Sequence, residues 1–316
     1  MKKMLVTLVL CLVSFFGGWT LHYLHPTIKP PLKTKAIQRE ELGKTLKILR
    51  GKISDVAIIE EKDMGSFTRK LLRFRWQGSS SEAYLLIPHE AKKKMPAILA
   101  LPGHNTTKEE VIGKIPSRFG VDYGQKLVKA GFCVLAPGIP FSHDMRVEDH
   151  VALILIMTGS SLTGMRVAYL RDLIDYLSSL PFIDPERLGC VGWSMGGALT
   201  MYLAAVDTRV KVVAISGYFG TYKDIFMTRR HTTDNYIPGI LAFGEMADVV
   251  CLVAPRPLWL EGGERDPDFP QEAFMKGIKD LQICYKGHEE RLAWQLLPGG
   301  HSFGGKGIED WFKRWL

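Results

Sequence analysis

The fold of this chain is decided by the stretch Leu188-Gly189-Cys190-Val191-Gly192-Trp193-Ser194-Met195-Gly196-Gly197. It has the form of a short apolar strand that delivers a serine into Gly-Trp-Ser-Met-Gly, followed by a helix beginning at Met195. Glycines two positions before and after Ser194 allow a tight strand-to-helix turn, where a Cβ would clash with the returning backbone. The strand before the serine and the small residues after it argue against an ordinary glycine- and serine-containing loop. We therefore predict that Ser194 is a nucleophile.

A nucleophilic serine needs a base, and the base needs an orienting carboxylate. On a sheet of this kind the chain order is serine, acid, histidine. Two late apolar strands run into loops that carry Asp266 and His301. We predict Asp266 as the acid and His301 as the base, with Asp268 and Glu264 as the alternatives for the acid.

Two backbone N–H groups should stabilise the oxyanion that such a serine generates. The first is that of Met195, directly after the serine. The second should come from the loop that follows the strand 96–101, and we choose the N–H of His104, with Asn105 as the alternative. The side chain of His104 is expected to orient this loop rather than to bind a metal or act as a base.

Apolar runs predict a mostly parallel sheet with helices on both faces and an antiparallel lead-in, an α/β class of fold. The expected lead-in strands are 55–61, 67–76 and 82–88, and the later strands are 96–101, 131–136, 188–193, 211–216, 257–261 and 294–297. The expected helices are 121–130, 165–180, 195–205, 236–253, 270–285 and 306–316. Longer excursions at 137–164 and 217–250 should cover the carboxyl ends of the strands, where ligands bind.

The positive charge of the chain is confined to its start. The net charge is +8, and residues 1–52 hold ten Lys or Arg and two Glu, so the remaining residues are balanced. A balanced body excludes a nucleic-acid footprint. Lys2 and Lys3 precede an almost wholly apolar stretch from Met4 to Leu21, which is long enough to span a bilayer.

These features divide the chain into a signal peptide or membrane anchor at 1–26, a solvated basic spacer at 27–52 that includes a helix, and a catalytic domain at 53–316. We favour an anchor over a cleaved signal, because no small-x-small cleavage site is clear. The body is then expected outside the cytoplasm, membrane-anchored or secreted. We make no prediction of oligomeric state.

The five cysteines form no metal-binding or redox pattern. Cys133, Cys190 and Cys251 sit in apolar runs, as buried thiols do, and Cys284 falls in an expected helix. We assign no disulfide and no metal ion.

Residues 96–301 resemble the α/β-hydrolase superfamily, in the branch of dienelactone hydrolases and bacterial acetyl xylan esterases. The matching stretches are LPGHNTTKEE, GMRVAYLRDLIDYLSSLPFIDPERLGCVGWSMGG, DNYIPGILAFGEMADVVCLVAPRPLWLEGGERDPDFP and LLPGGHSF. The resemblance implies an α/β-hydrolase fold, a triad of Ser194, Asp266 and His301, and no cofactor. Two departures are the Pro102-Gly103 start of the oxyanion loop, usually His-Gly, and a serine where dienelactone hydrolases use cysteine.

The leading hypothesis is a serine esterase acting on small-molecule carboxylic esters. Two alternatives are a peptidase similar to prolyl oligopeptidase, and a membrane-tethered binding protein that has lost the chemistry. The second excursion should supply the apolar lining of the pocket from Tyr218, Phe219, Tyr222, Tyr236 and Phe243. Its Arg229, Arg230 and His231 are expected to be solvated rather than to meet an acidic substrate.

Overall fold

The computed structural model describes residues 34–89 and 94–316. In this part of the chain nine strands form one sheet, in the order β1-β2-β3-β5-β4-β6-β7-β8-β9. The strands are β1 (Ile53–Asp63), β2 (Phe67–Trp76), β3 (Ser79–Pro88), β4 (Met95–Leu101), β5 (Cys133–Pro137), β6 (Ile183–Trp193), β7 (Val210–Ser216), β8 (Leu258–Gly263) and β9 (Leu292–Leu297).

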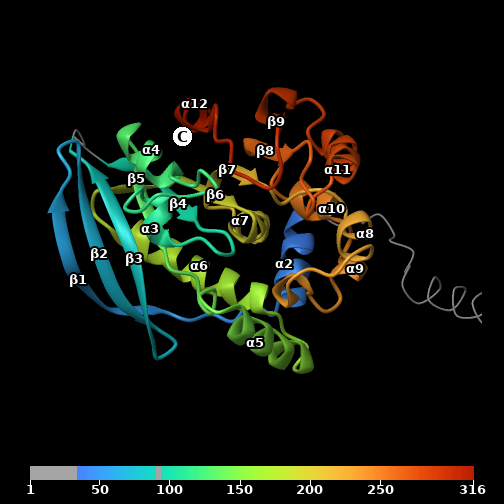
Figure 1. The fold of residues 1–316 in the computed structure, drawn as a ribbon, viewed down its shortest axis with the longest axis horizontal. Coiled ribbons are helices and arrows are strands. Elements are labelled where there is room, and N and C mark those ends of the chain that lie inside the picture. Colours follow the sequence, from blue (N-terminus) through green and yellow to red (C-terminus); the bar gives the residue numbers. More distant parts are fainter. Residues whose placement is uncertain (1–33, 90–93) are drawn as a thin grey trace, which may run out of the picture.

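The sheet combines an antiparallel edge with a parallel body. β1, β2 and β3 pair antiparallel, and β3 pairs antiparallel with β5. All pairings from β5 through β4, β6, β7 and β8 to β9 are parallel. Figure 1 shows β1 to β3 at one end of the molecule and β8 and β9 towards the other. The predicted α/β-hydrolase class, with its antiparallel lead-in, is therefore confirmed.

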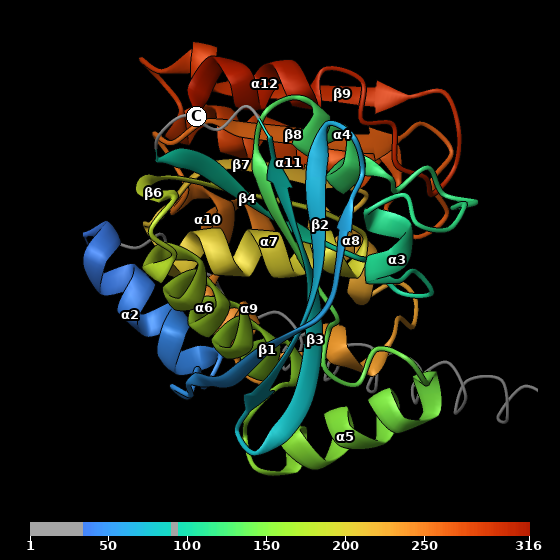
Figure 2. The same cartoon turned by 90° about the vertical axis from the view of Figure 1, so that its left-hand side faces the viewer.

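Helices pack against both faces of the sheet (Figure 2). The described helices are α2 (Lys35–Thr45), α3 (Lys108–Val111), α4 (Tyr123–Lys129), α5 (Met145–Met157), α6 (Leu162–Ser179), α7 (Met195–Val206), α8 (Tyr222–Phe226), α9 (Ile240–Phe243), α10 (Met246–Cys251), α11 (Gln271–Cys284) and α12 (Ile308–Trp315), with single 3₁₀ turns η1 (Thr233–Asn235) and η2 (Glu289–Arg291). One apolar core lies between the sheet and α2, α6, α7, α10 and α11. A second lies between the sheet and α3, α4 and α12.

Two expected connections differ in detail from the structure. The helix expected over 236–253 is divided into α9 and α10, because Glu245 caps α10 in a capping box: its side chain accepts a hydrogen bond from the Met246 N–H, and its own N–H donates to the Asp248 carboxylate at 2.8 Å. The excursion 137–164 contains a helix, α5, which Asp144 caps by accepting hydrogen bonds from the N–H groups of Arg146 and Val147.

The described part of the basic segment also differs from expectation. Helix α2 is solvated on one side only: Leu42 within it and Leu46 at its C-cap are fully buried in the core, whereas Lys35 and Glu40 are exposed. Lys35 Nζ and Arg39 Nη2 donate hydrogen bonds of 2.6 and 2.7 Å to the carbonyls of Ala254 and Leu252 after α10. These cations cap the end of a helix, so they act in packing rather than as a free basic surface.

The predicted anchor at residues 1–26 lies outside the described residues. Among the helices that the structure describes, none is by itself long and apolar enough to cross a membrane. Helices α5 and α6 are long and apolar enough only when taken together, and the chain bends by 99° between them.

Candidate active site

The turn at Ser194 has the backbone conformation that the sequence predicts. Ser194 follows β6 and precedes α7 with φ 54° and ψ −120°, which is unusual for a residue with a side chain. A Cβ on Gly192 would come within 2.1 Å of the Gly196 carbonyl oxygen, and a Cβ on Gly196 would come within 2.2 Å of the Leu101 carbonyl oxygen, so close backbone approach requires both flanking glycines. The Ser194 N–H donates to the Ser216 carbonyl at 2.9 Å, which ties the turn to the end of β7. Strain of this kind is typical of functional sites.

The three residues predicted to act together are brought into one hydrogen-bonded chain. His301 Nε2 lies 2.8 Å from Ser194 Oγ, and His301 Nδ1 lies 2.7 Å from Asp266 Oδ2. A carboxylate only accepts hydrogen bonds, so Nδ1 carries the proton and Nε2 of the neutral ring accepts from the serine hydroxyl. This is the arrangement in which an imidazole can remove the serine proton.

Asp266 is held by backbone donors in the loop after β8. It is 5% exposed, and its Oδ1 accepts hydrogen bonds from the N–H groups of Asp268 and Phe269 at 2.8 and 3.0 Å. Its Oδ2 is thereby directed to His301. The alternatives Asp268 and Glu264 are exposed, and neither is hydrogen-bonded to His301 among the described contacts. Aromatic rings also pack against the imidazole, since the ring centroids of Trp193 and Phe269 lie 4.9 and 5.7 Å from its own centroid.

The loop after β4 lies against the serine turn. Gly103 packs so closely that a Cβ there would come within 2.6 Å of the Trp193 ring. Met195 is the first residue of α7, where helix N–H groups have no partner inside the helix. His104, Ser194 and Met195 line one pocket, and their positions are therefore compatible with the two predicted oxyanion donors.

The pocket around Ser194 is open and mixed in character. It has a volume of about 600 Å³. It is lined by His104, Asn105, Phe119, Met145, Asp149, Trp193, Ser194, Met195, Tyr218, Arg230, His231, Thr232, Asn235, Asp268, Phe269 and His301. Of the second excursion, Tyr218, Arg230, His231, Thr232 and Asn235 are in this lining. The first excursion contributes Met145 and Asp149, which the sequence did not single out.

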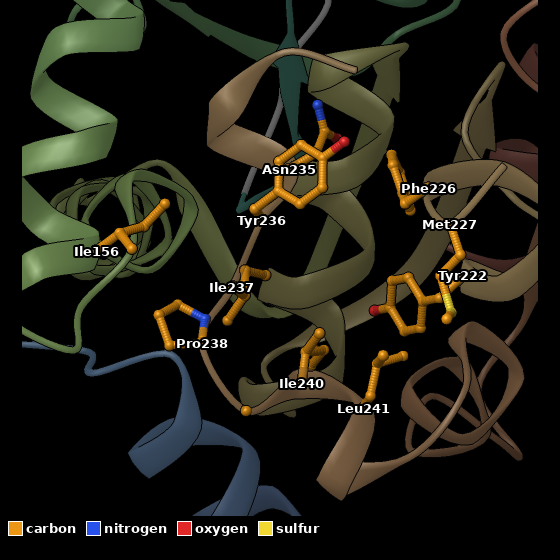
Figure 3. Close-up of a pocket in the computed structure, with 11 residues that line it drawn as sticks. Ile156, Tyr222, Phe226, Met227, Asn235, Tyr236, Ile237, Pro238, Ile240 and Leu241 are labelled. Carbon is orange, nitrogen blue, oxygen red and sulfur yellow. The ribbon is translucent and has the colours of Figure 1, made fainter. Parts of the chain in front are cut away.

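Figure 3 shows the lining of a second pocket, which has a volume of about 370 Å³. Asn235 lines both pockets. Tyr222 and Tyr236 line this apolar pocket rather than that of Ser194, so the expected lining was wrong for both. Phe219 is buried against Phe274, away from both pockets. Phe243, at the end of α9, is packed partly buried against the core and lines neither pocket.

Four charged side chains meet beneath the pocket, and only one of them was singled out from the sequence. His104 Nε2 lies 2.9 Å from Glu148 Oε1 and 3.2 Å from Asp234 Oδ2. Arg166 Nη1 donates to the same two oxygens, each at 2.9 Å. Burial acts to lower the pKa of His104, but hydrogen bonds to Asp234 and Glu148 outweigh it and raise the pKa from 6.5 to about 9.

Among residues 34–89 and 94–316, two groups of side chains have the spacing to hold a metal ion. They are His104, Glu148 and Asp234, and separately Asp266, Asp268 and His301. In the first group Arg166 already supplies the cation between the carboxylates, and in the second Asp266 and His301 are bonded to each other. Neither arrangement favours a metal, and the sequence-based expectation of no metal and no cofactor stays a prediction.

The expectation that no disulfide forms was wrong for one pair of cysteines. Cys251 at the end of α10 and Cys284 at the end of α11 form a disulfide, with a Cα–Cα distance of 5.6 Å. Their helices pack side by side, which brings together two residues that are 33 positions apart. Cys133 and Cys190 are buried free thiols, as expected, and burial raises the pKa of Cys190 to about 12.

Comparison with known proteins agrees with this description. The model of the Abhydrolase family matches residues 51–278. A protein named "Putative hydrolase YtaP", from Bacillus subtilis (strain 168), is 27% identical over 256 residues, covering 77% of this chain and 85% of that protein.

Two solved structures extend the comparison. A "putative acetyl xylan esterase" from Bacteroides fragilis NCTC 9343 has a TM-score of 0.68 at 19% identity, over 83% of this chain and 74% of that chain. A glucuronoyl esterase from Solibacter usitatus has a TM-score of 0.62 at 14% identity, over 90% and 93%. At these identities the two structures establish a shared fold.

Proposed function

Because the chain belongs to the Abhydrolase family, we propose that it is a serine esterase that cleaves small carboxylic esters through an acyl-enzyme intermediate. The observation that carries the proposal is the hydrogen-bonded chain from Asp266 through His301 to Ser194. The fold is shared with proteins named as esterases of acetyl xylan and of glucuronoyl groups, which favours ester substrates.

The proposed reaction follows from the positions of these groups. Ser194 Oγ attacks the acyl carbon while His301 Nε2 accepts its proton, and Asp266 stabilises the imidazolium that forms. The N–H groups of Met195 and His104 stabilise the negative charge on the acyl oxygen. His301 then returns the proton to the leaving alcohol. Water, activated by the same imidazole, releases the acyl group from the serine.

The proposal is tested by hydrolysis of p-nitrophenyl acetate, butyrate and octanoate with the folded protein. Ser194→Ala should lower kcat by roughly a thousandfold or more and abolish labelling by a fluorophosphonate probe. Ser302→Ala is the matched control, because this exposed serine lies next to His301 and should change neither activity nor labelling. Full activity in Ser194→Ala would refute the assignment. Turnover of an aminoacyl p-nitroanilide but of no ester would favour a peptidase.

We also propose that the catalytic domain lies outside the cytoplasm, attached through the N-terminal apolar segment. The Cys251–Cys284 disulfide supports this location, because structural disulfides persist mainly in oxidising compartments. The test is fractionation of cells that express the full chain. Retention of the protein in the membrane after an alkaline carbonate wash, with accessibility to external protease, is the expected result; a soluble cytoplasmic protein would contradict it.

A further inference from the structure

The buried charged cluster of His104, Glu148, Arg166 and Asp234 has no part in the proton transfers described above. Its members come from four separate segments, namely the loop after β4, α5, α6 and η1. Arg166 is 0%, Glu148 1% and Asp234 3% exposed. Buried charges are costly unless they are paired, so a cluster of this kind beside a reaction centre calls for a functional explanation.

The contacts require a proton on His104 Nε2. Glu148 Oε1 and Asp234 Oδ2 each accept from Arg166 Nη1 and each face His104 Nε2. An imidazole nitrogen between two carboxylate oxygens must be a donor. Each of these oxygens is thus shared between a guanidinium and an imidazole.

The same cluster touches both residues chosen as oxyanion donors. Arg166 Nη1 lies 3.2 Å from Met195 Sδ, at the first residue of α7. His104 is itself a member of the cluster and lines the pocket with Ser194. Arg166 Nε also donates to the Pro140 carbonyl at 3.0 Å, which fixes the start of the first excursion.

The charge of the cluster depends on His104. With an imidazolium, two positive and two negative groups balance. With a neutral imidazole, one buried negative charge remains beside the site where the oxyanion forms. In a low-dielectric interior that charge would oppose the reaction.

We propose that Arg166, Glu148 and Asp234 are positioning residues that hold His104 as an imidazolium beside Ser194, so that the cluster is neutral when the oxyanion forms. The proposal rests on the esterase function given above. The raised pKa of His104, about 9, agrees with it. The other titratable groups that line the pocket are Asp149, Arg230, His231, Asp268 and His301.

The first test is the pH dependence of kcat/KM for p-nitrophenyl acetate between pH 6 and 10.5, corrected for spontaneous hydrolysis. In the unmodified protein the profile should fall on the alkaline side with an apparent pKa near 9. Glu148→Gln removes one of the two carboxylates that stabilise the imidazolium. In this variant the apparent pKa of the alkaline limb should be lower by about one pH unit or more, and the acidic limb should stay in place.

Asp207→Asn provides a matched control. Asp207 is also a buried carboxylate paired with arginines, Arg171 and Arg209, but it lies at the other end of α7 and does not line the pocket. This variant should be less stable and should keep both limbs of the profile. An unshifted alkaline limb in Glu148→Gln, or an equal shift in Asp207→Asn, would overturn the inference.

The second test is an NMR titration of the histidine imidazoles, with the His104 signal assigned by its loss in His104→Gln. It needs no substrate and no folded Glu148 variant. An imidazolium at His104 that persists above pH 8 supports the proposal, and a neutral His104 at pH 7 overturns it. If Ser194→Ala retained ester turnover, the esterase function would fail, while the titration would still decide the charge of the cluster.

Discussion

The hydroxyl of Ser216, the last residue of β7, donates a 2.7 Å hydrogen bond to the carboxylate of Glu261 in the neighbouring strand β8. Both residues are 1% exposed. The same carboxylate oxygen accepts from the N–H groups of Gly304 and Gly305, at 3.0 and 3.2 Å. Glu261 therefore holds the loop that carries His301, although it does not touch the imidazole.

Substitution of Glu261 should lower activity through that loop. Glu261→Ala leaves the N–H groups of Gly304 and Gly305 without a buried acceptor, and a misplaced His301 should reduce kcat by roughly 10- to 100-fold with little change in KM. Glu261→Gln retains one acceptor oxygen and should recover part of the loss. Steady-state kinetics of both variants, beside the exposed Glu264→Gln as control, tests this role. Unchanged kcat in Glu261→Ala would exclude it.

The disulfide between α10 and α11 should contribute to stability and not to catalysis. Replacing Cys251 and Cys284 by serine should lower the free energy of unfolding by about 2–4 kcal/mol, because the cross-link restricts the unfolded chain. Urea unfolding with and without reductant measures the difference. The unmodified protein under reductant should be as stable as the double variant. If reductant also destabilised the double variant, the effect would not come from this disulfide.

The packing of α2 should be required by the domain. Leu42 is fully buried between α2 and the core, so Leu42→Ala should lower the free energy of unfolding by about 2–5 kcal/mol. Leu49, which is 68% exposed, provides the control, and Leu49→Ala should have little effect. Thermal unfolding of the two variants makes the comparison. Equal stabilities would mean that residues 34–52 form a dispensable spacer.

The charge on His104 should also appear in the stability of the protein. Because its pKa is raised from 6.5 to about 9 on folding, its stabilising contribution is complete below pH 6.5 and is lost as the pH rises through 9. The slope due to this group is at most about 1.4 kcal/mol per pH unit. Urea unfolding at pH 6, 7.5 and 9 should show this decline in the unmodified protein. A His104→Gln variant with the same decline would assign it to other groups.

The central strands of the sheet could be predicted from the sequence because they are buried on both faces. Val134 and Val191, for example, belong to continuous apolar runs with glycine or proline close by, and both are fully buried. The serine turn could also be predicted, because the glycines that it requires lie within two residues of Ser194. Patterns formed by neighbouring residues can be recognised in a single sequence.

Features formed between distant segments left no such signal. Cys251 and Cys284 occupy no spaced motif, and only the packing of α10 on α11 makes them neighbours. Glu148, Arg166 and Asp234 each read as an ordinary polar residue on a helix or turn. Their meeting at His104 depends on how two long excursions fold over the sheet, and no periodicity encodes that.

The charged cluster has a consequence for changing the substrate range of this protein. Glu148 belongs to the first excursion and Asp234 to the second, and these excursions also supply much of the wall of the Ser194 pocket. Grafting either segment from a relative would exchange the specificity surface together with a partner of His104. Under the proposed function, a change of substrate range in these segments would therefore also change the surroundings of His104. Libraries that redesign these segments should keep positions 148 and 234 acidic.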